Sequence, residues 1–287
     1  MKNKRTVLLI GLGEIGRPIF EILQECGRFT VYGLDLDETK MHVLGLTKEG
    51  LPRTVDVMHV CIPCVSKGKF VEIVTDYAKK FRPKLLIIDS TVPPTTTSEI
   101  HRNCNSLVAH SPVYGTHKNL EYMKWEMKRW TKVIGAVNAE SAKAASRHFQ
   151  DAGIKTRILS SPVETELTKL FETVYTAWMI IFFQEMHRIC KQFGASLEDV
   201  VDSIGEIHQT RLDRPVWYPN VIGGHCLIPN TELLLNAYDS EFFRLILESN
   251  EKRKREIKDR GVLEEVEKVK KRVEILQKEL INRLDLH

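Results

Sequence analysis

The sequence lacks any long hydrophobic run. Its longest apolar block, residues 177–183, is far shorter than the roughly 20 residues that a membrane-spanning helix needs. The apolar run that follows the basic residues at the start of the chain stops at Gly11, after five residues, and is too short for the core of a signal peptide. We therefore expect no membrane partner and a cytoplasmic location.

The sequence also lacks a charge excess and a disulfide pattern. Lys and Arg number 42 against 38 Asp and Glu, and no basic stripe is interleaved with aromatic residues, so we expect no nucleic-acid partner. Six scattered cysteines in 287 residues do not form a disulfide framework, and we expect reduced thiols. No metal site is predicted. The contents of hydrophobic (43%) and charged (28%) residues are those of a globular protein, which excludes disorder as the main state.

Three zones of different composition follow one another along the chain. In residues 1–160, short β-branched runs alternate with helical patterns, which predicts an α/β Rossmann domain with a doubly wound parallel sheet. The helical pattern of residues 161–250 predicts an all-helical domain that contains one long helix, 164–193. Residues 251–287 predict a charged, coiled-coil-like helical tail.

The first strand and helix indicate a dinucleotide-binding turn. A strand at 7–10 runs into the sequence GLGEIG, which opens a helix at 17–26. Glycines at these places allow a tight turn, close approach of a pyrophosphate and close packing of helix on strand. The helix N-terminus adds N–H groups for the phosphates. A glycine-rich turn that binds nothing is the alternative.

The second strand, 30–34, ends at an acid about twenty residues beyond these glycines. A carboxylate there binds the ribose hydroxyls and repels a 2′-phosphate, so we predict NAD rather than NADP. A second acid, Asp37, is expected to be the N-cap of a helix that starts at Glu38. The residues predicted to bind the cofactor in this region are Gly11, Gly13, Glu14, Ile15, Gly16 and Asp35.

Two further loops follow predicted strands and should reach the same cofactor. The sequence CIPC at 61–64 has no second ligand pair for a metal, so we interpret it as a tight loop near the nicotinamide, with Pro63 at the cofactor, rather than a redox or zinc site. In the loop 89–97, the hydroxyls of Ser90 and Thr91 stand where a parallel sheet binds cofactor or substrate. Alternatively, they only cap the next helix.

These motifs, taken in order, resemble the UDP-glucose/GDP-mannose dehydrogenases. The resemblance runs from the glycine turn through STVPPTTT at 90–97 and ETELTKLFETVYTAWMIIFFQE at 164–185 to GGHCLIPN at 223–230. The GGHC loop is similar to that of the UDP-N-acetylhexosamine dehydrogenases. The resemblance implies an NAD-dependent oxidoreductase that oxidises an alcohol of a sugar-like substrate by hydride transfer.

The resemblance also implies roles for particular residues. In this family a cysteine attacks the sugar aldehyde, and the resulting adduct is oxidised to a thioester and hydrolysed; Cys226 stands at that position. Lys169 matches the catalytic lysine, which stabilises an oxyanion or transfers a proton. Thr91 matches a threonine that helps to position water. We predict that these three residues share one cleft facing the nicotinamide, and that Cys226 is the most reactive thiol. His225 either assists the thiol or packs the loop.

The sequence departs from the family pattern at several places. Thr173 replaces an active-site asparagine, Asn230 replaces an aspartate, and Val113 replaces a glutamate that assists hydrolysis of the thioester. We also expect the third, nucleotide-sugar-binding domain of the family to be missing, because about 57 residues follow Asn230. Hydride transfer is compatible with these changes, whereas thioester hydrolysis by the family's route is not expected. Two alternatives stay open: a β-hydroxyacid-type dehydrogenase that uses Lys169 only, and a catalytically silent NAD-binding protein that recruits a partner.

The resemblance implies a homodimer built on the helix 164–193. Six apolar residues in succession, 178–183, make that helix hydrophobic all round, so it must be buried. In the tail, apolar residues recur in alternating steps of four and three, which is a heptad seam that should pack on a partner copy or on the chain's own body. The seam consists of Val262, Val266, Val269, Val273, Leu276 and Leu280.

Overall fold

The computed structural model describes residues 4–115, 118–211 and 217–284. It divides into two compact units, Met1–Leu170 and Phe171–His287, and each is described by itself. The side chains of residues 208–211 and 279–284 also lie outside the description. The predicted domain boundaries at 160 and 250 stay a prediction.

The first unit is built on one mostly parallel sheet. Its described strands lie in the order β2-β1-β3-β4-β5-β6-β7, and neighbours among β1 to β5 are all parallel. The strands are β1 (Arg5–Ile10), β2 (Phe29–Leu34), β3 (Val57–Val60), β4 (Leu85–Ile88), β5 (Leu107–His110), β6 (Lys132–Ala136) and β7 (Thr156–Ile158). The predicted α/β fold with a doubly wound sheet is confirmed. The expectation of a wholly parallel sheet is wrong at its far edge, because β6 pairs antiparallel with β5.

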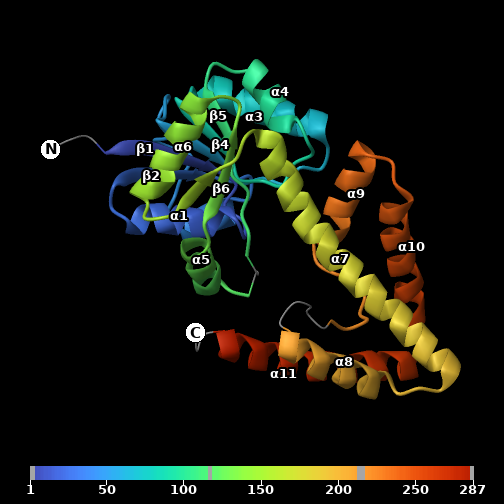
Figure 1. The fold of residues 1–287 in the computed structure, drawn as a ribbon. Helices are drawn as coiled ribbons and strands as arrows, with labels where there is room; N and C mark the ends of the chain where they lie inside the picture. The colour runs from blue at the N-terminus through green and yellow to red at the C-terminus, as the bar shows by residue number, and fades with distance from the viewer. Residues whose placement is uncertain (1–3, 116–117, 212–216, 285–287) are drawn as a thin grey trace. The chain divides into compact units, whose positions relative to one another are not determined.

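Helices cover both faces of this sheet. Figure 1 shows α3 and α4 on one side and α1 and α5 on the other. Because β3 and β4 are covered from both sides, every residue in them is buried and apolar or internally paired. The helices are α1 (Gly16–Glu25), α2 (Glu38–Val43), α3 (Lys67–Phe81), α4 (Thr96–Arg102), α5 (Leu120–Arg129) and α6 (Ala139–Asp151). The expected N-cap is confirmed, since the carboxylate of Asp37 accepts the N–H of Thr39 at 3.0 Å.

The second unit is helical. Its helices are α7 (Pro162–Phe193, which begins in the first unit), α8 (Leu197–Arg211), α9 (Leu227–Ala237), α10 (Glu241–Glu256) and α11 (Arg260–Leu284). The long predicted helix is confirmed and begins two residues earlier than expected. Over the described residues, no helix combines the length and the apolar character needed to cross a membrane.

The heptad seam of the tail packs inside the chain. Val266 and Val273 are fully buried in α11, which lies against α8. The seam joins a hydrophobic cluster with Phe183 and Cys190 of α7 and Val201 of α8. Of the two partners considered for the seam, the chain's own body is therefore the one observed; the side chain of Leu280 lies outside the described residues.

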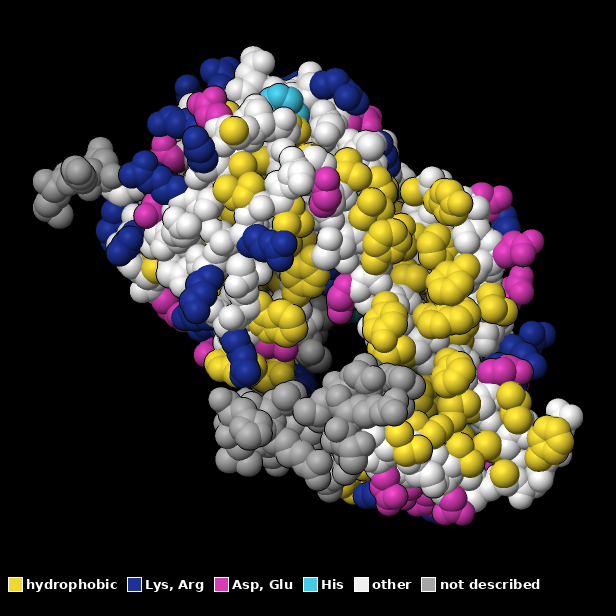
Figure 2. Space-filling view, viewed as in Figure 1, with side chains coloured by type: hydrophobic (Ala, Val, Ile, Leu, Met, Phe, Trp, Pro, Cys, Tyr) yellow, Lys and Arg dark blue, Asp and Glu magenta, His cyan; other side chains and the backbone are white. Residues whose placement is uncertain are grey.

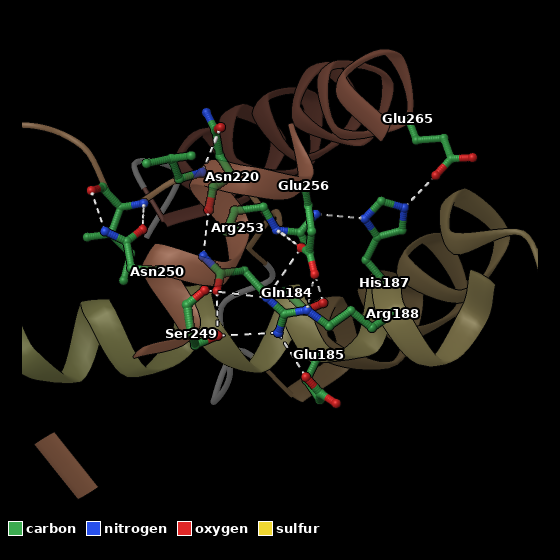
Figure 3. Close-up of polar contacts among 12 residues, drawn as sticks. Gln184, Glu185, His187, Arg188, Asn220, Ser249, Asn250, Arg253, Glu256 and Glu265 are labelled. Carbon is green, nitrogen blue, oxygen red and sulfur yellow. Dashed lines mark hydrogen bonds and ion pairs between the residues drawn. The ribbon is translucent and has the colours of Figure 1, made fainter. Parts of the chain in front are cut away.

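A buried polar network fixes α7, α10 and α11 to one another (Figure 3). The guanidinium of Arg253 is 1% exposed, and its Nη2 donates to the carbonyl oxygen of Gln184 at 3.0 Å. Its Nη1 lies 3.1 Å from Nδ1 of His187. Because a guanidinium only donates, Nδ1 accepts, and the Nε2–H of His187 faces the carboxylate of Glu265. Burial lowers the pKa of Arg253, although Glu256 lies 3.2 Å from its Nε.

Candidate functional site

The carboxyl ends of the parallel strands meet at one edge of the sheet. The register aligns the last residues of β1 to β5, so the residues that follow these strands lie side by side at that edge. Those following residues are Gly11, Asp35, Cys61, Asp89 and Ser111. The strand order reverses beside β1, and open α/β sheets bind ligands in the crevice at such a point.

The glycine turn between β1 and α1 is shaped by close contacts. Gly11 has φ +91°, and a Cβ there would lie 2.6 Å from the carbonyl oxygen of Cys61; a Cβ on Gly16 would lie 1.9 Å from the carbonyl oxygen of Gly11. A Cβ on Gly13 would meet no atom within 4 Å, so that part of the turn is open to a ligand. Ile15 at the N-cap of α1 makes no side-chain cap. In the first turn the N–H of Arg17 already donates to the carbonyl oxygen of Gly13 at 2.9 Å and Pro18 has no N–H, so an anion would meet the N–H of Gly16 and the positive end of the helix dipole.

The acid at the end of β2 is oriented toward this turn. Oδ2 of Asp35 accepts the backbone N–H of Leu12 at 2.7 Å, and Oδ1 accepts that of Asp37 at 2.9 Å. Each carboxylate oxygen keeps a further lone pair for a ribose hydroxyl. Glu14 is exposed at the turn itself. The glycine turn, the helix N-terminus and this carboxylate therefore fit the diphosphate and ribose of a dinucleotide.

The loops after β3 and β4 are tied together by one hydroxyl. Ser90 is buried, and its Oγ lies within donating distance of the carbonyl oxygens of Val60 (3.1 Å) and Ile62 (2.6 Å). Thr91 is half-buried beside it. The alternative that either residue caps the next helix is wrong, because α4 has Thr95 at its N-cap.

The two thiols of the CIPC loop are poor nucleophiles. Burial raises the pKa of the Cys61 thiol well above its ordinary value and that of Cys64 to about 11, while Pro63 between them is exposed. Protonated thiols neither attack disulfides readily nor bind zinc. In the part of the chain that the structure describes, no three His, Cys, Asp or Glu side chains gather as a metal site.

A buried glutamate that the sequence reading missed holds the loop after β4. Oε1 of Glu166 accepts the N–H (2.8 Å) and the hydroxyl (2.6 Å) of Thr97, and Oε2 accepts the N–H of Thr95 at 2.7 Å. Burial raises the pKa of this carboxyl. Thr95 has φ +73°, a strained conformation for a residue with a side chain. Glu166 thus fixes this loop from α7, one turn before Lys169.

A buried histidine links the same loop to α7. Nε2 of His110 lies 3.0 Å from the carbonyl oxygen of Ser90, and Nδ1 lies 2.8 Å from the hydroxyl of Thr165. Burial lowers the pKa of His110 to about 4, so the ring is neutral at pH 7. Since a carbonyl only accepts, Nε2 carries the proton, and Nδ1 is left without one where it faces the hydroxyl.

A second buried cluster lies under the edge of the sheet. Oδ2 of Asp89 is 2.7 Å from Nδ1 of His59, and Oδ1 is 3.3 Å from Nζ of Lys132. Burial alone would raise the pKa of Asp89, but the charges of His59 and Lys132 outweigh it and lower the pKa. Nε2 of His59 in turn lies 2.8 Å from Nε2 of His148 in α6. These contacts join β3, β4, β6 and α6 behind the candidate site.

Lys169 is half-buried on α7, with its Nζ 5.3 Å from the ring centroid of Tyr114. Tyr114 follows Val113, which is buried where the family has a glutamate. An aromatic face stabilises an ammonium group. Thr116 and His117, in the same loop, lie outside the described residues.

In the second unit, Cys226 stands at the N-cap of α9 and is half-buried, following the exposed residues 223–225. Nδ2 of Asn230 donates to the hydroxyl of Thr173 at 3.1 Å, and both side chains are buried. The structure therefore brings together the two positions at which the helical region departs from the family pattern. They form a neutral pair.

Lys169 and Thr91 belong to one unit and Cys226 to the other. The cleft that these three residues are predicted to share stays a prediction, and so do the roles assigned to them.

Residues 163–252 match the central domain of the UDP-glucose/GDP-mannose dehydrogenase family. This stretch contains Lys169, Thr173, Cys226 and Asn230. The resemblance to that family is confirmed. A UDP-N-acetyl-D-mannosamine dehydrogenase of Methanocaldococcus jannaschii is 25% identical over 307 residues, which cover 93% of the chain and 68% of the relative. For one of Methanococcus maripaludis the identity is 25%, over 86% of the chain and 65% of the relative. The chain thus spans about two thirds of the length of these dehydrogenases.

Solved structures show the same fold. The UDP-D-ManNAc dehydrogenase of Pyrococcus horikoshii superposes with a TM-score of 0.70 at 22% identity, over 86% of this chain and 68% of that one. A 3-hydroxyisobutyrate dehydrogenase of Mycobacterium tuberculosis has a TM-score of 0.65 at 18% identity, over 90% of this chain and 95% of that one. At these identities the likeness extends to the fold alone.

Proposed function

We propose that the chain is an NAD-dependent dehydrogenase that oxidises an alcohol of a nucleotide-sugar-like substrate. The observation that carries the proposal is the carboxyl edge of the sheet, where an open glycine turn, an uncapped helix N-terminus and an oriented Asp35 fit a dinucleotide. The match of residues 163–252 to the family's central domain and the names of the relatives support the substrate class.

The proposed chemistry divides between the two units. Bound NAD would supply the hydride acceptor. Lys169 would take the hydroxyl proton of the alcohol or stabilise the oxyanion, with Tyr114 supporting its ammonium. Cys226 would attack the aldehyde so formed, and Thr91 would position water. The neutral Thr173–Asn230 pair offers no carboxylate base, so we propose that the reaction need not continue to the acid.

The first test concerns the cofactor. We expect NADPH to bind at least tenfold more weakly than NADH, because the carboxylate of Asp35 would face a 2′-phosphate. Fluorescence titration of the protein with both cofactors measures this. Asp35→Asn should bring the affinities for NADH and NADPH closer together, because the amide has the shape of the carboxylate but no negative charge. Equal affinities of the unaltered chain would contradict the proposal.

A β-hydroxyacid-type dehydrogenase is the second candidate. The fold of the 3-hydroxyisobutyrate dehydrogenase covers 90% of this chain. A reaction of that type would use Lys169, as the resemblance implies, and no cysteine. A silent NAD-binding protein is the third. The requirement for Cys226 and Lys169, tested separately, distinguishes the three.

We also propose a homodimer built on α7. Ile180, Ile181 and Phe183 are buried, but Phe182, expected to be buried with them, is 58% exposed in the single chain. Figure 2 shows hydrophobic side chains gathered over α7, α9 and α10. The exposed apolar residues of α7 lie on one helical face and are Phe171, Tyr175, Phe182, Ile189 and Phe193. A stripe of this size marks an interaction surface.

Light scattering tests the dimer. Phe182→Asp would place a charge in the middle of the stripe and should weaken dimerisation by at least about 30-fold, the effect of losing about 2 kcal/mol at a hot spot. Glu185→Gln, on the same helix, serves as the control. A monomeric unaltered protein would refute the dimer.

A 1–258 variant that is as stable as the full chain would refute a role for the tail, whose seam is buried against α7 and α8.

A further inference from the structure

A cavity of about 610 Å³ lies beside the glycine turn of the first unit. One wall belongs to the dinucleotide site that the sequence predicts, namely the turn at Gly13 with the first turn of α1, and a second wall is α2. The third wall is residues 118–123, the start of α5. No sequence motif marks these residues as part of a cofactor site.

The third wall is fixed to the helix that begins at the glycine turn. Lys124 of α5 is only 6% exposed, although its side chain is charged. Its Nζ lies 3.3 Å from Oε2 of Glu21 and also pairs with Glu25, both on α1. Glu121 of α5 itself is a third acid beside this ammonium, and the two acids of α1 hold α5 against α1. The start of α5 thus has a set position relative to the first turn of α1.

The walls of the cavity carry three basic side chains, and two of them already have an acidic neighbour. Arg17 pairs with Glu21 at 3.2 Å, and Nζ of Lys40 lies 3.9 Å from Oδ1 of Asp35. The third, Lys118, is exposed, and its Nζ lies 4.5 Å from the ring centroid of Tyr122. Among the residues that the structure describes, no carboxylate pairs with it. Its charge is therefore available to an anionic ligand.

We infer that residues 118–123 form a third wall of the dinucleotide site and that Lys118 binds the diphosphate of the cofactor. The inference rests on the proposed cofactor. A diphosphate at the open turn by Gly13 would meet the N-terminus of α1, at Gly16, on one side and the ammonium of Lys118 on the other. Lys124 is then a positioning residue, because it holds the wall in place from the far side.

The test measures binding of NADH, ADP-ribose and adenosine by calorimetry or competition. Lys118→Met should weaken the binding of NADH and of ADP-ribose about tenfold. It should leave the binding of adenosine, which has no phosphate, unchanged. Lys118→Arg should retain most of the affinity, because it keeps the charge. Lys143→Met, an exposed lysine of α6 outside the cavity, is the matched control and should bind like the unaltered chain.

The outcomes separate this inference from the proposed function. If the unaltered chain binds neither NADH nor ADP-ribose, the proposed cofactor is wrong. If the unaltered chain binds both ligands and Lys118→Met binds them as tightly as the unaltered chain does, only the assignment of residues 118–123 to the dinucleotide site is wrong. An equal loss for adenosine would also overturn the assignment, since Lys118 would then act on the nucleoside and not on the diphosphate.

Discussion

Replacing Lys169 by methionine should lower kcat by about 10²–10⁴-fold, the range for losing a group that transfers a proton in the transition state. The variant should fold, because the side chain is half-buried and methionine keeps its stem beside Tyr114. The assay follows NADH formation from NAD with UDP-N-acetyl-D-mannosamine, UDP-glucose or 3-hydroxyisobutyrate as the substrate. Lys191→Met, an exposed lysine near the end of the same helix, is the control. Unchanged kcat in the Lys169 variant would contradict its catalytic role.

The same assay on Cys226→Ser decides which of the three functions applies. Loss of activity in both variants supports the nucleotide-sugar type, and loss in the Lys169 variant alone supports the β-hydroxyacid type. No turnover in the unaltered chain, with NADH still bound, supports a silent protein. Cys226 at a helix N-terminus should also react first with iodoacetamide, since the helix dipole stabilises a thiolate there. The raised pKa values of Cys61 and Cys64 make those thiols slow competitors.

Local patterns predicted the elements around the glycine turn well. The strand 57–60 is found as expected, and α1 and β2 each begin one residue before their predicted starts. The N-cap at Asp37 is also correct. These features depend on residues close together in the sequence: alternation of apolar runs, glycines at fixed spacing and an acid two residues before the N–H that it accepts. Such signals are present in the chain before any tertiary contact forms.

The polar contacts that shape the site depend on residues far apart in the sequence. Glu166 meets Thr97 across 69 positions, and His110 meets Thr165 across 55. An acid in the first turns of a helix is favourable at its surface, so its type alone does not indicate burial. Nor does the composition of a strand reveal its direction, which is why the reversal of β6 was not expected. The pairing of Asn230 with Thr173 likewise needed the folded helices.

Replacing Arg253 by methionine should lower the free energy of unfolding by about 3–5 kcal/mol, the usual effect of removing one member of a buried charged network. Methionine fills much of the volume of the arginine stem, so the loss comes mainly from the polar groups left behind. The carbonyl oxygen of Gln184 and Nδ1 of His187 would both lose their donor inside the second unit. His187 would also lose the contact that orients its Nε2–H toward Glu265.

Urea denaturation of the full chain, followed by circular dichroism, measures this loss. The matched control is Lys254→Met at the neighbouring position of α10. Its side chain is exposed and pairs with the exposed Glu251, and there we expect a change in the free energy of unfolding within about 0.5 kcal/mol. His187→Met alone and combined with Arg253→Met completes a double-mutant cycle, and a coupling above about 0.5 kcal/mol is expected for residues in direct contact. Additive effects of the two substitutions would show that Arg253 stabilises the fold without His187. An unchanged urea midpoint in the Arg253 variant would refute the network's contribution to stability, because α10 and α11 would then be held on α7 by their apolar contacts alone.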